Sequence, residues 1–283
     1  MANGTTYLTR TLSSGADRTK GTWSFWIKRG DAEDTIFQGI FGGRKNSSNN
    51  GNIFQIFLQK NDNGAGVQCA FWNSSGTMLG NKRTLNAMRD LSAWYHVVCT
   101  IDTTLATADD RIKIYVNGER ITNLAGSPNT NPSQNDTFAF FNNYSNHQQM
   151  VGGFYATGST AEQGKLNGIL SHVHACDGYA YDASAFGETD STTGEWKIKT
   201  SPSVTYGTNG FFILKDGNSV TDQSPNTNNF TVAAGTLTKS EDNPSNVFAT
   251  LNPLVNINSN LTLSKGNNTM TLGSTSWIGT VSS

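Results

Sequence analysis

The sequence has few charged residues and no long apolar run. Asp, Glu, Lys and Arg make up 14% of the 283 residues, and the formal net charge is −1, whereas about 25% of an average soluble protein is charged. Without a cluster of Lys and Arg to neutralise phosphates, we expect no binding to nucleic acid. Because no apolar run approaches the roughly 20 residues that cross a bilayer, we also expect no membrane insertion.

Cysteine is scarce as well. Cys69, Cys99 and Cys176 are the three cysteines, and they lie far apart in the sequence. The N-terminal residues lack the charged segment and the apolar segment of a secretion signal, so we expect folding in a cytoplasm, where disulfides rarely persist. We therefore predict three buried free thiols rather than a disulfide framework.

Turn-forming and aromatic residues take the place of charge. The chain has 29 Gly, 15 Phe and 6 Trp. Glycine and small polar residues favour turns over long helices, while the aromatic side chains are sufficient to build a core. Alternation of apolar and polar residues predicts strands at 22–29 and 53–60, and a nearly continuous apolar run predicts a strand at 94–101 that is covered on both faces. We expect no helix longer than about three turns, and a short helical turn at 85–93.

The clearest local signal lies between residues 111 and 121. Ile112, Ile114 and Val116 alternate with polar residues, and Asn117 and Gly118 follow them. An Asn-Gly pair between two extended runs supplies the two positive φ angles of a type I′ turn, so we predict a hairpin here. Many short strands joined by polar turns, without alternating helices, favour a sandwich of antiparallel sheets.

Three groups of residues, read together, resemble a known family. They are YLTR at 7–10 with WSFWIKRG at 23–30, AWYHVV at 93–98 with DDRIKIYVNG at 109–118, and the stretches 168–178, 186–190 and 193–196. The series resembles the concanavalin A-like, laminin-G-like jelly-roll domains of bacteriophage virion proteins, especially those of marine phages. The stretches 206–211, 222–230 and 243–254 are similar to the connector that follows the jelly roll in those proteins.

These observations predict an all-β protein, an antiparallel jelly-roll β-sandwich of the concanavalin A-like type, over residues 1–199. Residues 200–255 are rich in Gly, Asn, Ser and Pro, and we predict an extended connector there. Residues 256–283 are predicted to form a small β extension, or the start of a second β domain of a longer chain.

The resemblance implies a structural protein of the phage virion, such as a tail fibre, spike or capsid-decoration component. It would be displayed on the virion surface after assembly in the host cytoplasm. Its partners would be other virion proteins and further copies of itself, as a trimer. The alternative is a lectin module that binds host glycans. We expect no enzymatic activity in either case.

The candidate catalytic residues are Glu188 and Asp190. Some related enzymes carry Glu-x-Asp-x-x-Glu on one strand, because two carboxylates must flank the bond that is cleaved. Here position 193 is Thr, and the pair lies in a polar loop. We therefore predict no catalytic residue.

A metal site is the next candidate. Alternation places His172, His174 and Cys176 on one strand face together with Leu170, and zinc accepts these ligand types. Neighbours on one face of a strand lie about 7 Å apart, too far to share one ion, so we expect core or half-buried histidines. A metal on a trimer axis is the remaining alternative. Calcium is a further alternative, because jelly-roll lectins often bind it, but no loop has the density of Asp that it requires. We predict no cofactor.

Glycan or partner contact is the last candidate. Phe140, Asn142, Asn143, Tyr144 and His147 combine aromatic surface with amide groups in one polar loop, which suits a sugar. The alternative is that these aromatic side chains cap one end of the sandwich. Both interpretations stay open at this point.

Overall fold

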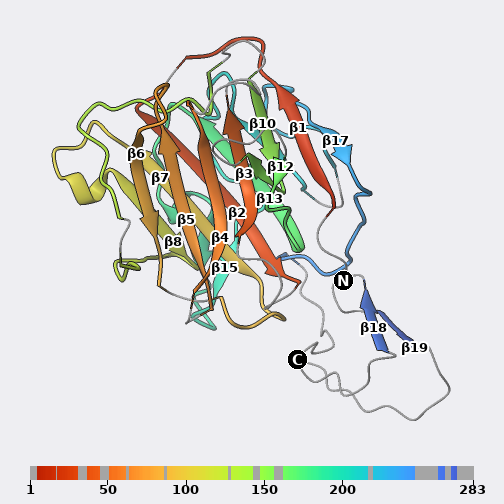
Figure 1. Cartoon of the computed structure of the whole chain (residues 1–283). Helices are drawn as coiled ribbons and strands as arrows, with labels where there is room; N and C mark the ends of the chain where they lie inside the picture. The colour runs from red at the N-terminus through yellow and green to blue at the C-terminus, as the bar shows by residue number, and fades with distance from the viewer. Residues whose placement is uncertain are drawn as a thin grey trace.

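The computed structural model describes residues 5–16, 18–30, 37–44, 51–61, 64–85, 88–126, 129–142, 147–155, 162–215, 219–245, 261–264 and 269–272. Within these ranges two large antiparallel sheets pack face to face (Figure 1). This is the predicted all-β sandwich of the jelly-roll type. Among the described residues, no helix is long and apolar enough to cross a bilayer.

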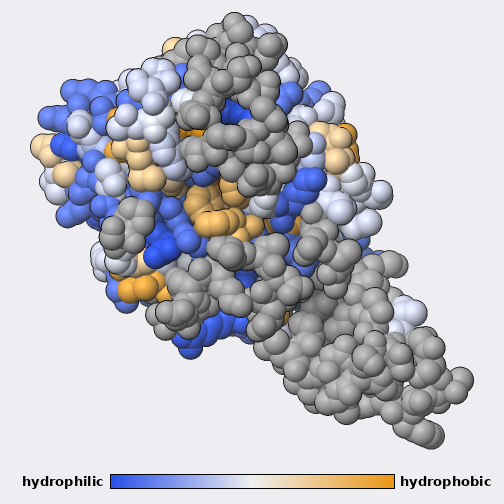
Figure 2. All heavy atoms as spheres, in the orientation of Figure 1, coloured by the Kyte–Doolittle hydropathy of each residue, from blue (hydrophilic) through white to orange (hydrophobic). Residues whose placement is uncertain are grey.

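The sheet that faces the viewer in Figure 1 has seven strands in the order β17-β1-β10-β3-β4-β5-β6. They are β1 (Tyr7–Thr11), β3 (Phe37–Arg44), β4 (Phe54–Asn61), β5 (Gly64–Trp72), β6 (Met78–Arg83), β10 (Gln148–Val151) and β17 (Thr231–Ala234). On this face the described surface is mostly hydrophilic, with an apolar area near its centre beside grey atoms (Figure 2).

The second sheet has six strands in the order β16-β13-β2-β7-β8-β9. They are β2 (Lys20–Arg29), β7 (Tyr95–Asp102), β8 (Ile112–Val116), β9 (Glu119–Arg120), β13 (Gly168–Asp177) and β16 (Phe211–Ile213). Shorter pairs are β11 (Phe154–Tyr155) with β12 (Glu162–Gln163), β14 (Gly187–Thr189) with β15 (Trp196–Ile198), and β18 (Leu261–Ser264) with β19 (Thr269–Leu272). Two 3₁₀ turns are described, η1 (Ala108–Asp110) and η2 (Ala183–Ala185).

The core lies between the two sheets and is mainly aromatic. Trp23 of β2 is fully buried and stacks on Phe54 of β4, with 4.3 Å between ring centroids. The rings of Phe140 and Phe141 lie 5.4 and 5.5 Å from the Trp23 ring. Burying each such side chain contributes about 1.5–3 kcal/mol. The predicted strands at 22–29 and 53–60 are confirmed, with their apolar faces turned inward.

The strand β7 is covered on both faces, which accounts for its nearly continuous apolar sequence. Cys99 packs in the central core, whereas its neighbour Val98 packs in a second cluster with Phe186, Tyr206 and Phe212. The predicted hairpin also forms, and its turn residues Asn117 and Gly118 have φ angles of 49° and 85°. All three cysteines are free and buried, as predicted.

The predicted connector is part of the sandwich wherever it is described. Its strand β16 pairs with β13, and β17 pairs with β1, so each large sheet receives an edge strand from it. The side-chain amides of Asn226 and Asn228 donate to the carbonyl oxygen of Gly210 at 3.0 and 2.8 Å. Further along, Asp242 forms a buried ion pair with Lys28 of β2 at 2.8 Å. Residues 200–215 and 219–245 are therefore not an extended linker.

The short helical turn predicted at 85–93 is wrong for the residues described there. Residues 88–93 form bends without a helical hydrogen-bond pattern. Tertiary hydrogen bonds take its place: the Arg29 guanidinium donates to the carbonyl oxygen of Met88 at 2.5 Å, and the backbone N–H of Asp90 donates to the Tyr95 hydroxyl at 3.0 Å. Contacts of this kind override weak local propensity.

Candidate functional site

The aromatic loop proposed for glycan contact does not present its rings to solvent. Phe140 and His147 are both fully buried, and the Phe140 ring packs edge-on against Trp23. Burial lowers the pKa of His147 to about 3, so its imidazole is neutral. Asn142 is half-buried, and Asn143 and Tyr144 lie outside the described residues. The exposed-platform interpretation is wrong for Phe140 and His147, which are core residues.

The three candidate metal ligands do not share one face with Leu170. A β-bulge shifts the pairing of β13 with β2 between Ser171 and His174, and His172 has a φ of 48°. Leu170 consequently packs toward the central core, whereas Cys176 belongs to the second cluster. His174 is buried on that side, where its ring stacks 3.9 Å from Phe212. In the described residues no group of three His, Cys, Asp or Glu is placed to hold a metal.

Glu188 and Asp190 lie in the hairpin β14–β15, where they stabilise a turn. Lys197 pairs with both carboxylates, at 3.5 and 3.2 Å. Asp190 also accepts the backbone N–H groups of Thr192 and Thr193 at 2.8 and 3.0 Å. These hydrogen bonds, with Lys197, lower the pKa of Asp190 to about 2. A carboxylate held in its charged form suits a turn better than a general acid.

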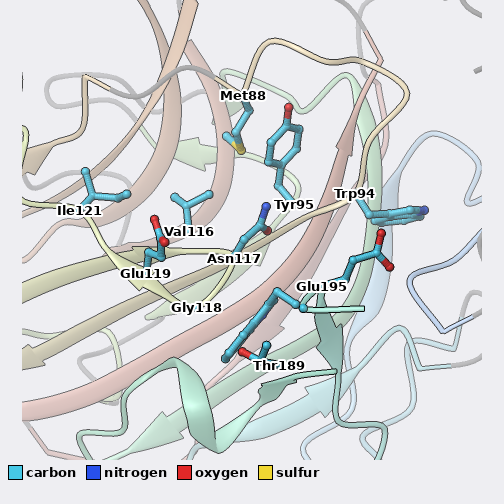
Figure 3. A pocket seen from close by; sticks show the side chains of 12 residues that line it. Met88, Trp94, Tyr95, Val116, Asn117, Gly118, Glu119, Ile121, Thr189 and Glu195 are labelled. Atoms are coloured by element: carbon cyan, nitrogen blue, oxygen red, sulfur yellow. The ribbon is translucent and has the colours of Figure 1, made fainter. Parts of the chain in front are cut away.

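A cavity of about 720 Å³ opens at one end of the six-stranded sheet. It lies where β7 begins, between the hairpin β8–β9 and the hairpin β14–β15 (Figure 3). We call it the aromatic pocket, and its lining residues are Met88, Trp94, Tyr95, Val116, Asn117, Gly118, Glu119, Ile121, Thr189, Gly194, Glu195 and Trp196. None of them was singled out as a site residue from the sequence.

The Trp196 ring is held in place by close backbone contacts and by a hydrogen bond. A Cβ added at Gly118 or at Gly187 would lie 2.5 Å from atoms of its indole, so the backbone at both glycines lies against the ring. Its Nε1–H donates to Nδ1 of His96 at 3.0 Å, and the two rings are stacked with 5.9 Å between centroids. Trp196 remains half-buried, which leaves part of the ring accessible.

His96 supports this arrangement from inside the sheet. It is fully buried and stacks on Trp26, with 4.9 Å between ring centroids. Burial lowers its pKa to about 3, so the imidazole is neutral. Because Nδ1 accepts the hydrogen bond from Trp196, the proton resides on Nε2, which donates to Oγ of Ser24 at 2.9 Å. His96 therefore orients Trp196 and adds no charge to the pocket.

Trp94, Tyr95 and Asn117 are also held by hydrogen bonds. The indole N–H of Trp94 donates to the buried carboxylate of Asp242 at 3.2 Å, and the Tyr95 hydroxyl accepts from Asp90. The side-chain oxygen of Asn117 accepts the backbone N–H of His96 at 2.8 Å. Figure 3 shows the other end of the Asn117 amide directed into the pocket, below the Tyr95 ring.

Two carboxylates flank this centre. Glu119 and Glu195 lie on opposite sides of Asn117 (Figure 3) and both are exposed. Within the described part of the chain, neither side chain has a hydrogen bond or an ion pair. Aromatic faces can cover the apolar side of a sugar ring, while amide and carboxylate groups can bind its hydroxyls. The pocket therefore combines the groups that a small polar ring requires.

Comparison with known proteins gives the family. Residues 3–156, more than half of the 283, match the family described as the concanavalin A-like lectin/glucanases superfamily. The chain belongs to this family. The concanavalin A-like fold is thus shown by both the family match and the two antiparallel sheets. No curated protein matches the chain.

Solved structures with similar folds are distant in sequence. A pentraxin from Limulus polyphemus is 14% identical, with 64% of this chain and 74% of that chain covered and a TM-score of 0.44. A protein from Bacteroides ovatus, described as a putative carbohydrate-binding protein, is 17% identical. The match covers 87% of this chain and 61% of that chain, with a TM-score of 0.47. The enzymatically active domain of tailspike protein 2 from bacteriophage CBA120 is 10% identical. The match covers 61% of this chain and 24% of that chain, with a TM-score of 0.39. This chain spans less than two thirds of the length of the Bacteroides ovatus protein and of the tailspike protein.

Proposed function

We propose that the protein is a carbohydrate-binding domain and that the aromatic pocket is its binding site. One observation carries the proposal: three aromatic side chains, Trp94, Tyr95 and Trp196, are fixed by polar contacts around a cavity of about 720 Å³. Small-molecule sites are commonly cavities of about 300–1,000 Å³ with apolar walls and a few placed polar groups. Because hydrogen bonds already hold the three rings, little entropy is lost when a ligand orders them.

The test is a glycan array followed by calorimetric titration of the strongest hits. The variant Trp196→Ala removes the accessible ring, and we expect it to weaken binding by about 1.5–3 kcal/mol, which is tenfold or more in Kd. Tyr179→Ala is the matched control, since Tyr179 is 42% exposed but does not line the pocket. Equal affinity in the wild type and Trp196→Ala would contradict the proposed site.

We further propose that binding proceeds without catalysis. Glu119 and Glu195 are exposed on hairpins, whereas the general acid of a glycoside hydrolase needs a sheltered environment to hold its proton. Purified protein is expected to release no reducing sugar from the glycans that it binds. Release that disappears in Glu119→Gln or Glu195→Gln would show instead that these residues are catalytic.

A role in the virion is the second candidate, and it concerns where the binding domain acts. The residues that resemble phage virion jelly rolls, 93–98 and 109–118, fall on the adjacent strands β7 and β8. We propose a surface component, such as a fibre, spike or decoration protein, that assembles as a trimer with other virion proteins. Immunogold labelling of intact particles is expected to decorate their surface. Absence of the protein from purified particles would contradict this role.

A further inference from the structure

The charge of the aromatic pocket restricts what it can bind. Among the described residues that line it, the charged ones are Glu119 and Glu195. Their carboxylates lie on either side of Asn117 (Figure 3) and have no partner within the described ranges. Placing an anionic group between them would bring like charges together, whereas a cationic group would form charge-assisted hydrogen bonds.

In the described residues, the cations that lie near the pocket along the chain have contacts of their own, including Arg89 beside Met88. Lys28 is bound to Asp242, and Lys197 is bound to Glu188 and Asp190. Arg29 is buried and donates to the carbonyl oxygen of Met88.

Two further groups complete the surroundings of the pocket. Arg120, although next to Glu119 in the chain, pairs with Asp110 at 2.6 Å. His96, behind the Trp196 ring, is buried and donates through Nε2 to Ser24. The pocket therefore keeps the negative charge of its two glutamates.

We propose that the aromatic pocket selects sugars by charge: it prefers units that carry a protonated amino group and disfavours units that carry a carboxylate or a sulfate. This inference rests on the proposed carbohydrate-binding function and adds the ligand class. The ring of the amino sugar stacks on Trp196, and its ammonium group donates to Glu119 or Glu195. Since both carboxylates are exposed, the preference for the amine over its neutral N-acetyl form is moderate, about two- to fivefold in Kd.

The test compares matched sugars, so that ring stereochemistry and charge are separated. Glucosamine, N-acetylglucosamine and glucuronic acid form one series, and the corresponding galacto and manno compounds form two more, all displayed at the same density. Wild type, Trp196→Ala and the double variant Glu119→Gln/Glu195→Gln are measured at low ionic strength. The control Glu188→Gln changes an exposed carboxylate that lies outside the pocket lining.

We expect the wild type to bind the amine best and the acid least in at least one series. The double variant is expected to lose the amine preference while it retains binding to the N-acetyl sugar, and Glu188→Gln is expected to behave like the wild type. Equal or tighter binding of the acid, or an amine preference that survives in the double variant, overturns the charge selection alone. No binding in any series, or binding that Trp196→Ala leaves intact, overturns the carbohydrate-binding function as well.

Discussion

The ion pair between Lys28 and Asp242 allows a quantitative prediction. Its atoms are 2.8 Å apart, and the side chains are 2% and 0% exposed. Asp242→Ala would leave the Lys28 ammonium buried without this partner, which costs about 3–5 kcal/mol. Loss of the hydrogen bond from Trp94 to the same carboxylate adds about 0.5–1.5 kcal/mol. Native proteins unfold with only about 5–15 kcal/mol, so this single change removes a large fraction of the stability.

Urea denaturation measures the effect directly. With a slope near 3 kcal/mol per molar urea, roughly the upper end for small proteins, the combined loss of about 3.5–6.5 kcal/mol moves the midpoint down by about 1.2–2.2 M. The double variant Lys28→Met/Asp242→Leu is expected to regain most of the loss, because an apolar pair replaces a buried ion pair at little cost. Glu188→Ala breaks an exposed pair with Lys197 and is expected to cost less than about 1 kcal/mol.

Two outcomes would refute this reasoning. One is a loss below about 1 kcal/mol in Asp242→Ala, which would mean that the pair behaves like an exposed one. The other is a double variant as unstable as the single one, which would mean that packing of residues 239–245, rather than charge, carries the effect.

Three further outcomes are expected. Gly118→Ala forces a Cβ to 2.5 Å from the Trp196 ring, so it should lose about 1–3 kcal/mol more than Gly178→Ala, as thermal unfolding would show. Gly178 has a similar positive φ, but the nearest atom to its added Cβ, Nε of Arg18, is 4.0 Å away. His96 and His147 have pKa values of about 3 in the folded protein against 6.5 unfolded. Protonation of each histidine in the unfolded state should therefore lower the free energy of unfolding by about 1.4 kcal/mol per pH unit as pH falls from 6 toward 3. Urea titrations that show no such slope would contradict this. Asp242→Asn should weaken glycan binding through Trp94, an effect that calorimetry would detect.

The sequence was sufficient for the parts of the fold that depend on local pattern. The strands β2 and β4 follow from alternation, β7 from its continuous apolar run and the turn at Asn117 from turn chemistry, all of which act over a few residues. The strands β16 and β17 were assigned to a connector because their surroundings are rich in turn residues. Their place at the sheet edges is set instead by pairing with β13 and β1, and β1 lies more than 200 residues away from β17 in the chain.

The site could not be predicted from the sequence, for two physical reasons. Trp94, Asn117 and Trp196 come from three separate segments, and only the fold brings them together. A weak signal was present, because each lies beside a turn or at a strand end, where side chains are often accessible. The second reason is the bulge at His172. Its one positive φ reverses the face of the sheet that the following residues occupy, and the alternation of residues in the sequence does not reveal it.

The most direct test of the account is a crystal structure of the protein with the saccharide that binds most tightly on the array. We predict a sugar ring stacked on the accessible part of Trp196, with its polar groups bonded to Asn117 and to Glu119 or Glu195. A sugar bound elsewhere on the sandwich, with the aromatic pocket empty, would contradict it.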